Sequence, residues 1–281
     1  MTSAPVRFRV GEFACVSLPD TIETLLEEHL QLMFPTDTDR WLAAFRALPG
    51  SLTFCRNILL VEARAQRLLI DTGNGSADPN DPGHLLEQLR AANLPPESIT
   101  TLVITHYHPD HLGGLVDESG RPSFPNARLV VPSQEHAHWT QPDVLAGLDP
   151  ADAAAFHRMV AAHADRLTPL DDTAAIAPGI HYLSAVGHSP GHRAVLLESG
   201  GARLLHLADA IHTPLQLNAL DQAPFDWQHP AAAAATRRAL VSQAAAEGLL
   251  VMAYHFPFPG VGYFRRHGDQ LAWEPYTASA P

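Results

Sequence analysis

The feature that most constrains this chain is a ligand-rich turn that directly follows a short apolar strand. The apolar segment Thr101–Thr105 predicts a buried strand, and the sequence HYHPDHLGG follows it over residues 106–114. Four side chains in this turn are able to bind a metal ion: His106, His108, Asp110 and His111. Imidazole nitrogen and carboxylate oxygen suit zinc and similar first-row divalent ions. The turn therefore predicts a metal site at one strand end.

One compact turn cannot complete two coordination spheres, because neighbouring ligands cannot surround an ion. Further ligands are expected from loops that lie far away in the sequence. The candidates stand in a GHSPGH segment and after two later predicted strands: His192, Asp209 and His255. A lone histidine or aspartate at a strand end is usually an ordinary polar residue. Three of them following the first turn favour a shared site.

The basic residues narrow the chemistry further. All 18 of them are arginine, so no lysine exists for a Schiff base, a phosphate-binding loop or a general base. The chain has no lysine but contains 17 histidines. Reactive chemistry in this chain is therefore expected to use imidazole and carboxylate groups.

Charge and hydropathy exclude several partners. The formal net charge of −12 disfavours a nucleic acid as partner, since the surface repels phosphates. No apolar run approaches the roughly 18 residues that span a bilayer, so no membrane partner is expected. The first ten residues lack the apolar stretch of a secretory signal, which predicts a cytoplasmic protein.

The two cysteines, Cys15 and Cys55, are interpreted as buried thiols.

The order of elements predicts a single domain over residues 1–281. Strands come in runs separated by helices at wide intervals, which favours mixed sheets covered by helices. Strands are predicted over Val6–Leu18 and Thr53–Ala63, and helices over Thr21–Met33, Pro82–Asn93 and Pro230–Glu247. Asp81 is the predicted N-cap of the helix that begins at Pro82. An extra helical segment over about residues 20–48 is interpreted as a lid or a homodimer contact.

The ordered ligand set resembles that of the metallo-β-lactamase-fold hydrolases, and the resemblance runs from about Thr53 to Tyr276. The sequence HFPFPG at residues 255–260 and the sequence DAIH at 209–212 are most similar to one branch, which contains methyl parathion hydrolase and related lactonases and aryl-esterases. The resemblance implies an α/β fold, a four-layer αββα sandwich.

The resemblance also implies a dinuclear centre. It assigns His106, His108 and His192 to one metal, Asp110, His111 and His255 to the other, and Asp209 to a bridge between them. Zinc is the expected metal, although manganese, cobalt and iron accept the same ligands. His188 is then the histidine of the GHSPGH segment that does not bind metal. Asp71 either orients a metal ligand or only stabilises the turn in which it lies.

The chemistry implied is hydrolysis by a hydroxide shared between two metal ions. Asp110 is the candidate for moving a proton toward the leaving group. Some acyl-homoserine lactonases of this fold have a tyrosine three residues after the bridging aspartate, and this chain has His212 there. That histidine either hydrogen-bonds the substrate or simply packs. Five aromatic residues are candidates for a substrate pocket, with core packing as the alternative: Trp139, Phe225, Trp227, Phe256 and Phe258.

The leading hypothesis is a lactonase that acts on a small neutral substrate, an acyl-homoserine or aryl lactone. Aryl esters and organophosphate triesters are expected as side substrates. The alternatives are an organophosphate hydrolase related to methyl parathion hydrolase, a thioesterase of the glyoxalase-II kind, and a metal-binding module without catalysis.

Overall fold

The structure is a computed structural model of the 281-residue chain, and it describes residues 3–35, 37–48, 50–76, 81–172, 174–222 and 229–277. One sheet contains β1 (Val6–Val10), β2 (Phe13–Thr24), β3 (Thr53–Ala63), β4 (Gln66–Ile70), β5 (Thr101–Val103), β6 (Arg128–Pro132) and β7 (Leu167–Leu170). The other contains β8 (Ala175–Ala177), β9 (Ile180–Ser184), β10 (Arg193–Ser199), β11 (Ala202–His206), β12 (Leu250–Met252), β13 (Val261–His267) and β14 (Gln270–Pro275).

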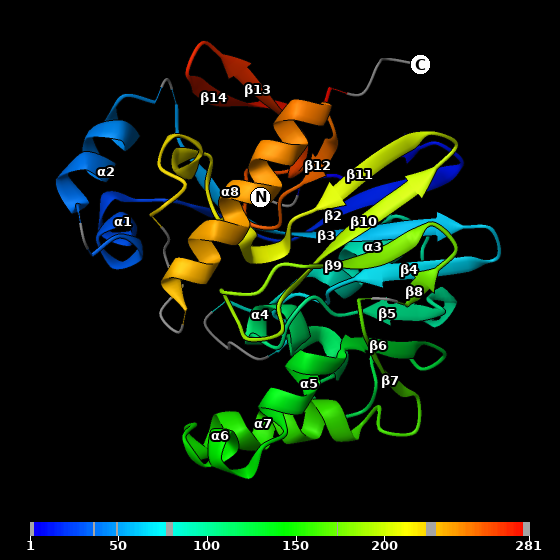
Figure 1. The fold of residues 1–281 in the computed structure, drawn as a ribbon. Helices are drawn as coiled ribbons and strands as arrows, with labels where there is room; N and C mark the ends of the chain where they lie inside the picture. The colour runs from blue at the N-terminus through cyan, green and yellow to red at the C-terminus, as the bar shows by residue number, and fades with distance from the viewer. Residues whose placement is uncertain are drawn as a thin grey trace.

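Eight α-helices are found in the described ranges: α1 (Glu27–Met33), α2 (Thr38–Arg46), α3 (Leu85–Ala91), α4 (Pro109–Leu112), α5 (Ser133–Trp139), α6 (Pro142–Ala146), α7 (Pro150–Ala161) and α8 (Pro230–Glu247). Short 3-10 turns follow several strands, among them η2 (Gly113–Leu115), η3 (Ala208–Ala210) and η4 (Pro214–Asn218). Figure 1 shows the two sheets face to face, with α8 on one outer side and α5 to α7 toward the other end.

Both sheets are mixed, as the sequence predicts. In the first sheet β1 to β4 pair antiparallel, whereas β4 to β7 pair parallel. In the second sheet only β11 and β12 pair parallel. Parallel neighbours place their carboxyl ends at one edge of the sheet, and several candidate ligands follow such ends.

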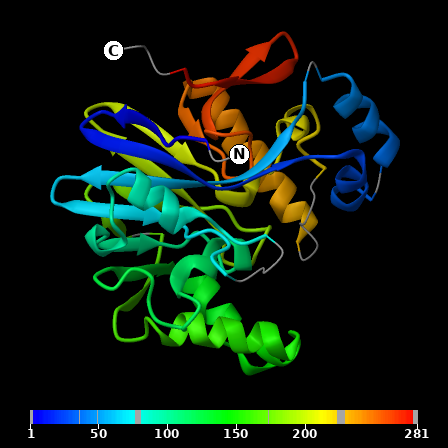
Figure 2. The same ribbon diagram turned by 180° about the vertical axis from the view of Figure 1, so that it is seen from behind.

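Strand β3 shows how the layers form. Its run Ile58 to Val61 is fully buried, because the strand is covered on both faces. Leu59 and Val61 pack between the sheets, whereas Ile58 and Leu60 pack under helices α3 and α7. Helix α8 covers the outer face of the second sheet in the same way. Figure 2 shows α3 over the first sheet from behind. The four-layer αββα sandwich is thereby confirmed.

The N-terminal segment differs from its prediction in two ways. The predicted strand Val6–Leu18 is a hairpin, because Gly11 turns the chain with φ of 56°, and a Cβ there would meet the carbonyl oxygen of Ser199 at 1.9 Å. The predicted helix Thr21–Met33 begins only at Glu27, since β2 runs on to Thr24 and pairs with β3. Threonine and isoleucine favour a strand when a partner strand is present.

Helix α3 also begins later than predicted. Its N-cap is His84, and Asp81 instead accepts hydrogen bonds from Arg56 at 2.7 Å and from the Asn74 side chain at 3.0 Å. The carboxylate of Asp81 therefore fixes a loop near β3 rather than capping a helix.

Helices α1 and α2 lie to one side of the sandwich and form their own apolar cluster, which also contacts η4 (Figure 1). Leu26, which precedes α1, and Leu32 within it are 49% and 77% exposed. A lid or a homodimer contact at this segment stays a prediction. None of the helices in the described ranges is both long and apolar enough to cross a membrane.

Candidate metal centre

The first ligand-bearing loop leaves the sheet at the end of β5. The short helix α4 follows, with Pro109 at its first position, and the His111 amide donates to the carbonyl of His108 at 3.0 Å. His106 and His111 are fully buried, whereas the Asp110 side chain is 24% exposed. This turn therefore points two imidazoles inward and leaves one carboxylate in contact with solvent.

The loops after β5, β11 and β12 converge on Asp209, whose side chain is only 4% exposed. Its carboxylate lies 3.1 Å from Nε2 of His255, 3.2 Å from Nε2 of His111 and 4.0 Å from Nε2 of His106. Four overlapping sets of three residues have ligand atoms within 4.8 Å of one another: His106, His108 and His188; His106, His111 and Asp209; Asp110, His111 and His255; and His188, Asp209 and His212.

The electrostatics favour a cation at this point. Burial alone lowers the pKa of His111, but the carboxylates of Asp209, Asp71 and Asp110 outweigh it and raise that pKa well above its usual value. Burial alone raises the pKa of Asp209, yet the facing His255 and His111 hold it well below its usual value. The cluster therefore keeps its carboxylates charged and attracts positive charge.

Other imidazoles of the cluster are held neutral, the form in which histidine binds metal. Burial lowers the pKa of His192 to about 3, and burial together with the neighbouring His111 lowers the pKa of His106 well below its usual value. Nε2 of His106 and Nε2 of His111 are buried without a hydrogen-bond partner among the described residues. Buried nitrogens without partners beside charged carboxylates fit a divalent metal ion.

Asp71 orients one of these histidines. It follows β4 and is fully buried, with its carboxylate accepting from the Thr105 amide and hydroxyl at 2.8 Å each. The same carboxylate lies 2.8 Å from Nδ1 of His111, which leaves Nε2 directed toward Asp209. Of the two roles that the sequence left open for Asp71, the contacts favour orienting a ligand.

Asn57 fixes the loop that carries His255. It is fully buried on β3, and its Nδ2 donates to the carbonyls of Tyr254 and Phe256 at 2.8 and 2.7 Å. Nδ1 of His255 in turn lies 3.0 Å from the carbonyl oxygen of Cys55. A single strand thus holds both the backbone and the ring of this loop.

We expect Asn57→Ala to lower the free energy of unfolding by about 3 kcal/mol, because two or more buried carbonyls lose their donor. Urea denaturation measures the change. Asn126→Ala is the matched control, since its exposed side chain makes one hydrogen bond, to the carbonyl of Glu97. Equal losses for both variants would contradict this role of Asn57.

The two histidines of the GHSPGH segment both lie close to the first ligand turn. His192 lies beside His106, with ring centroids 4.9 Å apart, and its Nε2 accepts a hydrogen bond from the Asp209 amide at 3.2 Å. His188, expected as a non-ligand, instead joins two of the ligand sets, and its Nε2 lies 2.9 Å from Nδ1 of His108. His192 as a metal ligand therefore stays a prediction.

His212 and Trp139 lie at the border of the cluster. Nε2 of His212 is 3.4 Å from Asp209, and its ring stacks on His255 with centroids 5.4 Å apart. The Trp139 ring lies 6.2 Å from that of His108. Phe54, which the sequence analysis missed, stacks on His255 at 4.2 Å.

The other residues predicted to line a substrate pocket do not all lie beside the cluster. Phe256 is fully buried and packs against Phe264 and Trp273 between the second sheet and α8, so it belongs to the core rather than a pocket wall. Phe258 is half-buried in the next turn. Phe225 and Trp227 lie outside the described residues.

Arg56 on β3 is a second residue that the sequence analysis missed. Its guanidinium forms ion pairs with Glu23 and Asp81 at 2.7 Å each, and its Nε lies 3.6 Å from Oδ2 of Asp110. A fixed cation therefore stands behind the most exposed carboxylate of the cluster. No motif marks this arginine, because its partners Glu23, Asp81 and Asp110 come from three segments that are far apart in the sequence.

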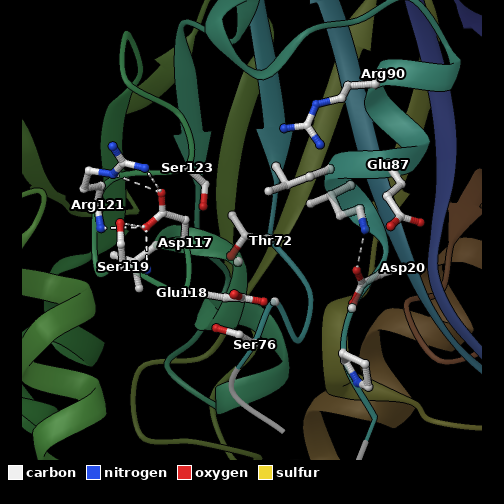
Figure 3. Close-up of a pocket in the computed structure, with 17 residues that line it drawn as sticks. Asp20, Thr72, Ser76, Glu87, Arg90, Asp117, Glu118, Ser119, Arg121 and Ser123 are labelled. Carbon is white, nitrogen blue, oxygen red and sulfur yellow. Dashed lines mark hydrogen bonds and ion pairs between the residues drawn. The ribbon is translucent and has the colours of Figure 1, made fainter. Parts of the chain in front are cut away.

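A cavity of about 480 Å³ is lined by residues outside the cluster, and Figure 3 shows the side chains around it. Thr72 and Gly114 line it, each just beyond a residue of the site, but none of the predicted ligands does. Two of its charged side chains, Arg121 and Asp117, pair with each other, and Asp20 accepts a hydrogen bond from the amide at the start of α3. The cavity therefore has no evident part in the metal chemistry.

The comparisons with known proteins agree with this geometry. The sequence model of the metallo-β-lactamase superfamily matches residues 56–246, more than half of the chain. The chain belongs to the metallo-β-lactamase superfamily. The match contains His106 through Asp209, whereas His255 lies beyond it.

Relatives in this superfamily are distant. A probable metallo-hydrolase of Mycobacterium tuberculosis is 29% identical over 202 residues, which cover 60% of this chain and 61% of that protein. The chain thus spans about three fifths of the length of the curated relatives it first matches. The atrochrysone carboxyl ACP thioesterase of Passalora fulva is 33% identical over 107 residues, covering 38% of this chain and 28% of that protein.

Solved structures match over the full length. AidC, a dizinc quorum-quenching lactonase, superposes with a TM-score of 0.88 and 24% identity, covering 99% of both chains. The hydrolase AbOPH superposes with a TM-score of 0.88 and 23% identity, covering 100% of both. At this identity the likeness establishes the metallo-β-lactamase fold and leaves the substrate open.

Proposed function

We propose that this protein is a metal-dependent hydrolase and that its substrate is a lactone. The observation that carries the proposal is the buried cluster around Asp209, in which histidine nitrogens and aspartate oxygens from separate loops lie within 4.8 Å of one another. Such a concentration of charged carboxylates and imidazoles is costly to bury unless it holds a cation. In the described residues no other set of this kind is found.

A divalent metal bound here would supply a Lewis acid and lower the pKa of water to near neutrality. The chain's own groups do the rest. Asp209 and the histidines around it hold the charge in place, and Asp71 fixes the ring of His111. Asp110 is the one carboxylate among these ligands with a partly exposed side chain, so its Oδ2 takes a proton from the attacking water and passes it to the leaving group. His212, whose Nε2 lies 3.4 Å from Asp209, is the candidate for a hydrogen bond to the substrate.

A neutral substrate fits the charges. The chain carries a net charge of −12. This charge repels an anionic substrate during its approach to the protein, whereas a lactone or simple ester is not repelled. The full-length likeness to a dizinc lactonase supports a cyclic ester in particular.

A thioester is the second candidate. The similarity to an acyl-carrier-protein thioesterase favours it, although that similarity covers only 38% of the chain. The same metal chemistry hydrolyses both bonds, so the substrate pocket decides between them.

We expect kcat/KM for an acyl-homoserine lactone to exceed that for a matched p-nitrophenyl ester, a thioester and a paraoxon-like triester by about tenfold or more, a difference of about 1.4 kcal/mol. A parallel assay with the zinc-loaded protein measures the four values, and chelator-treated protein gives the background. A larger value for the thioester would favour the second candidate, and one for the triester would favour an organophosphate hydrolase.

A further inference from the structure

Glu135, which no motif marks, is a buried carboxylate between two ligand-bearing loops. It lies in the first turn of α5 and is fully buried. Its Oε1 accepts from the Tyr107 amide at 3.0 Å and from Nε1 of Trp139 at 2.8 Å. Its Oε2 accepts from the Ser189 hydroxyl at 2.8 Å and from the Gly191 amide at 2.7 Å. All four bonds have good lengths.

The two oxygens divide their partners by loop. Tyr107 stands between His106 and His108, so Oε1 fixes the backbone of the first ligand turn. Ser189 and Gly191 stand between His188 and His192, so Oε2 fixes the GHSPGH segment. One carboxylate thus joins two loops that are about 80 residues apart in the sequence. The first loop follows a strand of one sheet, and the second connects two strands of the other sheet.

The second loop packs directly on α5. A Cβ at Gly191 would lie 2.1 Å from the Glu135 amide nitrogen, so this position has room only for glycine. Arg193, which directly follows this loop, donates to the carbonyls of Gly191 and His192 at 2.9 and 3.0 Å. The backbone of the loop is therefore held by side-chain hydrogen bonds as well as by its packing on α5.

We propose that Glu135 is a positioning residue of the metal centre, which aligns the His106–His108 turn with the GHSPGH segment so that their imidazoles meet at one point. The inference rests on the proposed function only in that the cluster binds metal. It adds a residue that touches neither the metal nor the substrate and acts through the backbone of the ligands.

The chemistry of an amide makes Glu135→Gln a sharp test. Glutamine keeps one acceptor oxygen, but its NH₂ group must face two donors. If the NH₂ replaces Oε2, the Ser189 hydroxyl is able to rotate and accept a hydrogen bond from it. The Gly191 amide is only a donor and loses its acceptor. If it replaces Oε1, the Tyr107 and Trp139 donors both lose their acceptor. Either orientation frees one ligand loop from the other.

We expect Glu135→Gln to weaken binding of Zn²⁺ or Co²⁺ by about 10- to 100-fold, as removal of groups that orient ligands commonly does. Competition with a chromophoric chelator measures the affinity, and the Co²⁺ absorption spectrum reports the altered ligand geometry. Both measurements use the full chain with the metal alone, without substrate.

Asp20→Asn is the matched control. Asp20 is also a buried carboxylate that accepts backbone hydrogen bonds, from the Asn74 and Leu85 amides at 2.8 and 2.9 Å, but both donors lie in the segment from the end of β4 to the start of α3, which carries no candidate metal ligand. We expect both variants to melt at lower temperature and only Glu135→Gln to lose metal affinity. Equal affinities of Glu135→Gln and wild type, or equal losses in both variants, would overturn the proposal.

Ser189→Ala covers the case in which Glu135→Gln does not fold. It removes one donor to Oε2 and leaves the carboxylate and the Gly191 bond in place. We expect a several-fold loss of metal affinity with the chain still folded, and an unchanged affinity would count against the proposal. Wild-type protein that binds no Zn²⁺ or Co²⁺ would contradict the proposed function itself, whereas a wild type that binds and variants that bind equally would contradict only the role of Glu135.

Discussion

Asp209→Asn is expected to lower kcat/KM for hydrolysis by about 1000-fold or more, about 4 kcal/mol in transition-state stabilisation. Asp209 is the carboxylate on which the ligand loops converge, with Nε2 of His255 and of His111 at 3.1 and 3.2 Å. Asparagine has nearly the same shape but carries no charge. The substitution therefore removes the negative charge that offsets a bound cation, while the packing around residue 209 is kept.

The measurement combines kinetics with metal content. Elemental analysis of Asp209→Asn should find less metal per chain than in wild type, and circular dichroism should find the same secondary structure. Asp269→Asn is the control, because this exposed aspartate lies in the turn between β13 and β14. His108→Ala is expected to act in the same direction as Asp209→Asn. Full activity in Asp209→Asn would show that hydrolysis, if present, does not use this cluster.

Removal of metal is expected to lower the melting temperature by about 10 °C. A ligand at about 1000 times its Kd stabilises the folded state by about 4 kcal/mol, and each kcal/mol corresponds to roughly 2–4 °C in a chain of this size. The physical source is the cluster itself. Against the effect of burial, neighbouring carboxylates raise the pKa of His111, whereas burial lowers the pKa of His106. A metal ion displaces the proton of His111 and gives the ring nitrogens of both residues a partner.

Thermal unfolding of the zinc-loaded protein, with and without a chelator, measures this shift. Magnesium is the control ion, because it prefers oxygen ligands in octahedral geometry and is expected to restore little of the loss, whereas zinc or cobalt restores it. A melting temperature that no first-row divalent ion changes would contradict a metal centre here.

Much of the fold follows from local patterns in the sequence. Strand β3 spans Thr53–Ala63 and helix α8 spans Pro230–Glu247, as predicted. Long apolar or alanine-rich segments strongly favour one kind of secondary structure. Cys15 and Cys55 are buried free thiols, as predicted. The predicted helix Thr21–Met33 failed, since its first residues pair with β3, and a local pattern does not contain that partner.

The ligand candidates were visible in the sequence because each combines metal-binding chemistry with a strand end. His106, His108, Asp110 and His111 share one turn, and Asp209 and His255 follow later strands. The parallel pairing of β11 and β12 brings Asp209 and His255 together, and the packing of the two sheets on each other brings them to the turn after β5.

Only the tertiary structure decided how these groups are held. Arg56 lies behind Asp110, Asn57 fixes the His255 loop, and Glu135 joins two ligand loops through four hydrogen bonds. It also placed His188 beside His108, and Phe256 in the core. Metal-binding chemistry belongs to a side chain and can be read one residue at a time. Orientation depends on backbone groups that meet only after the chain has folded, so the sequence determined what the centre is made of and the fold determined how it is arranged.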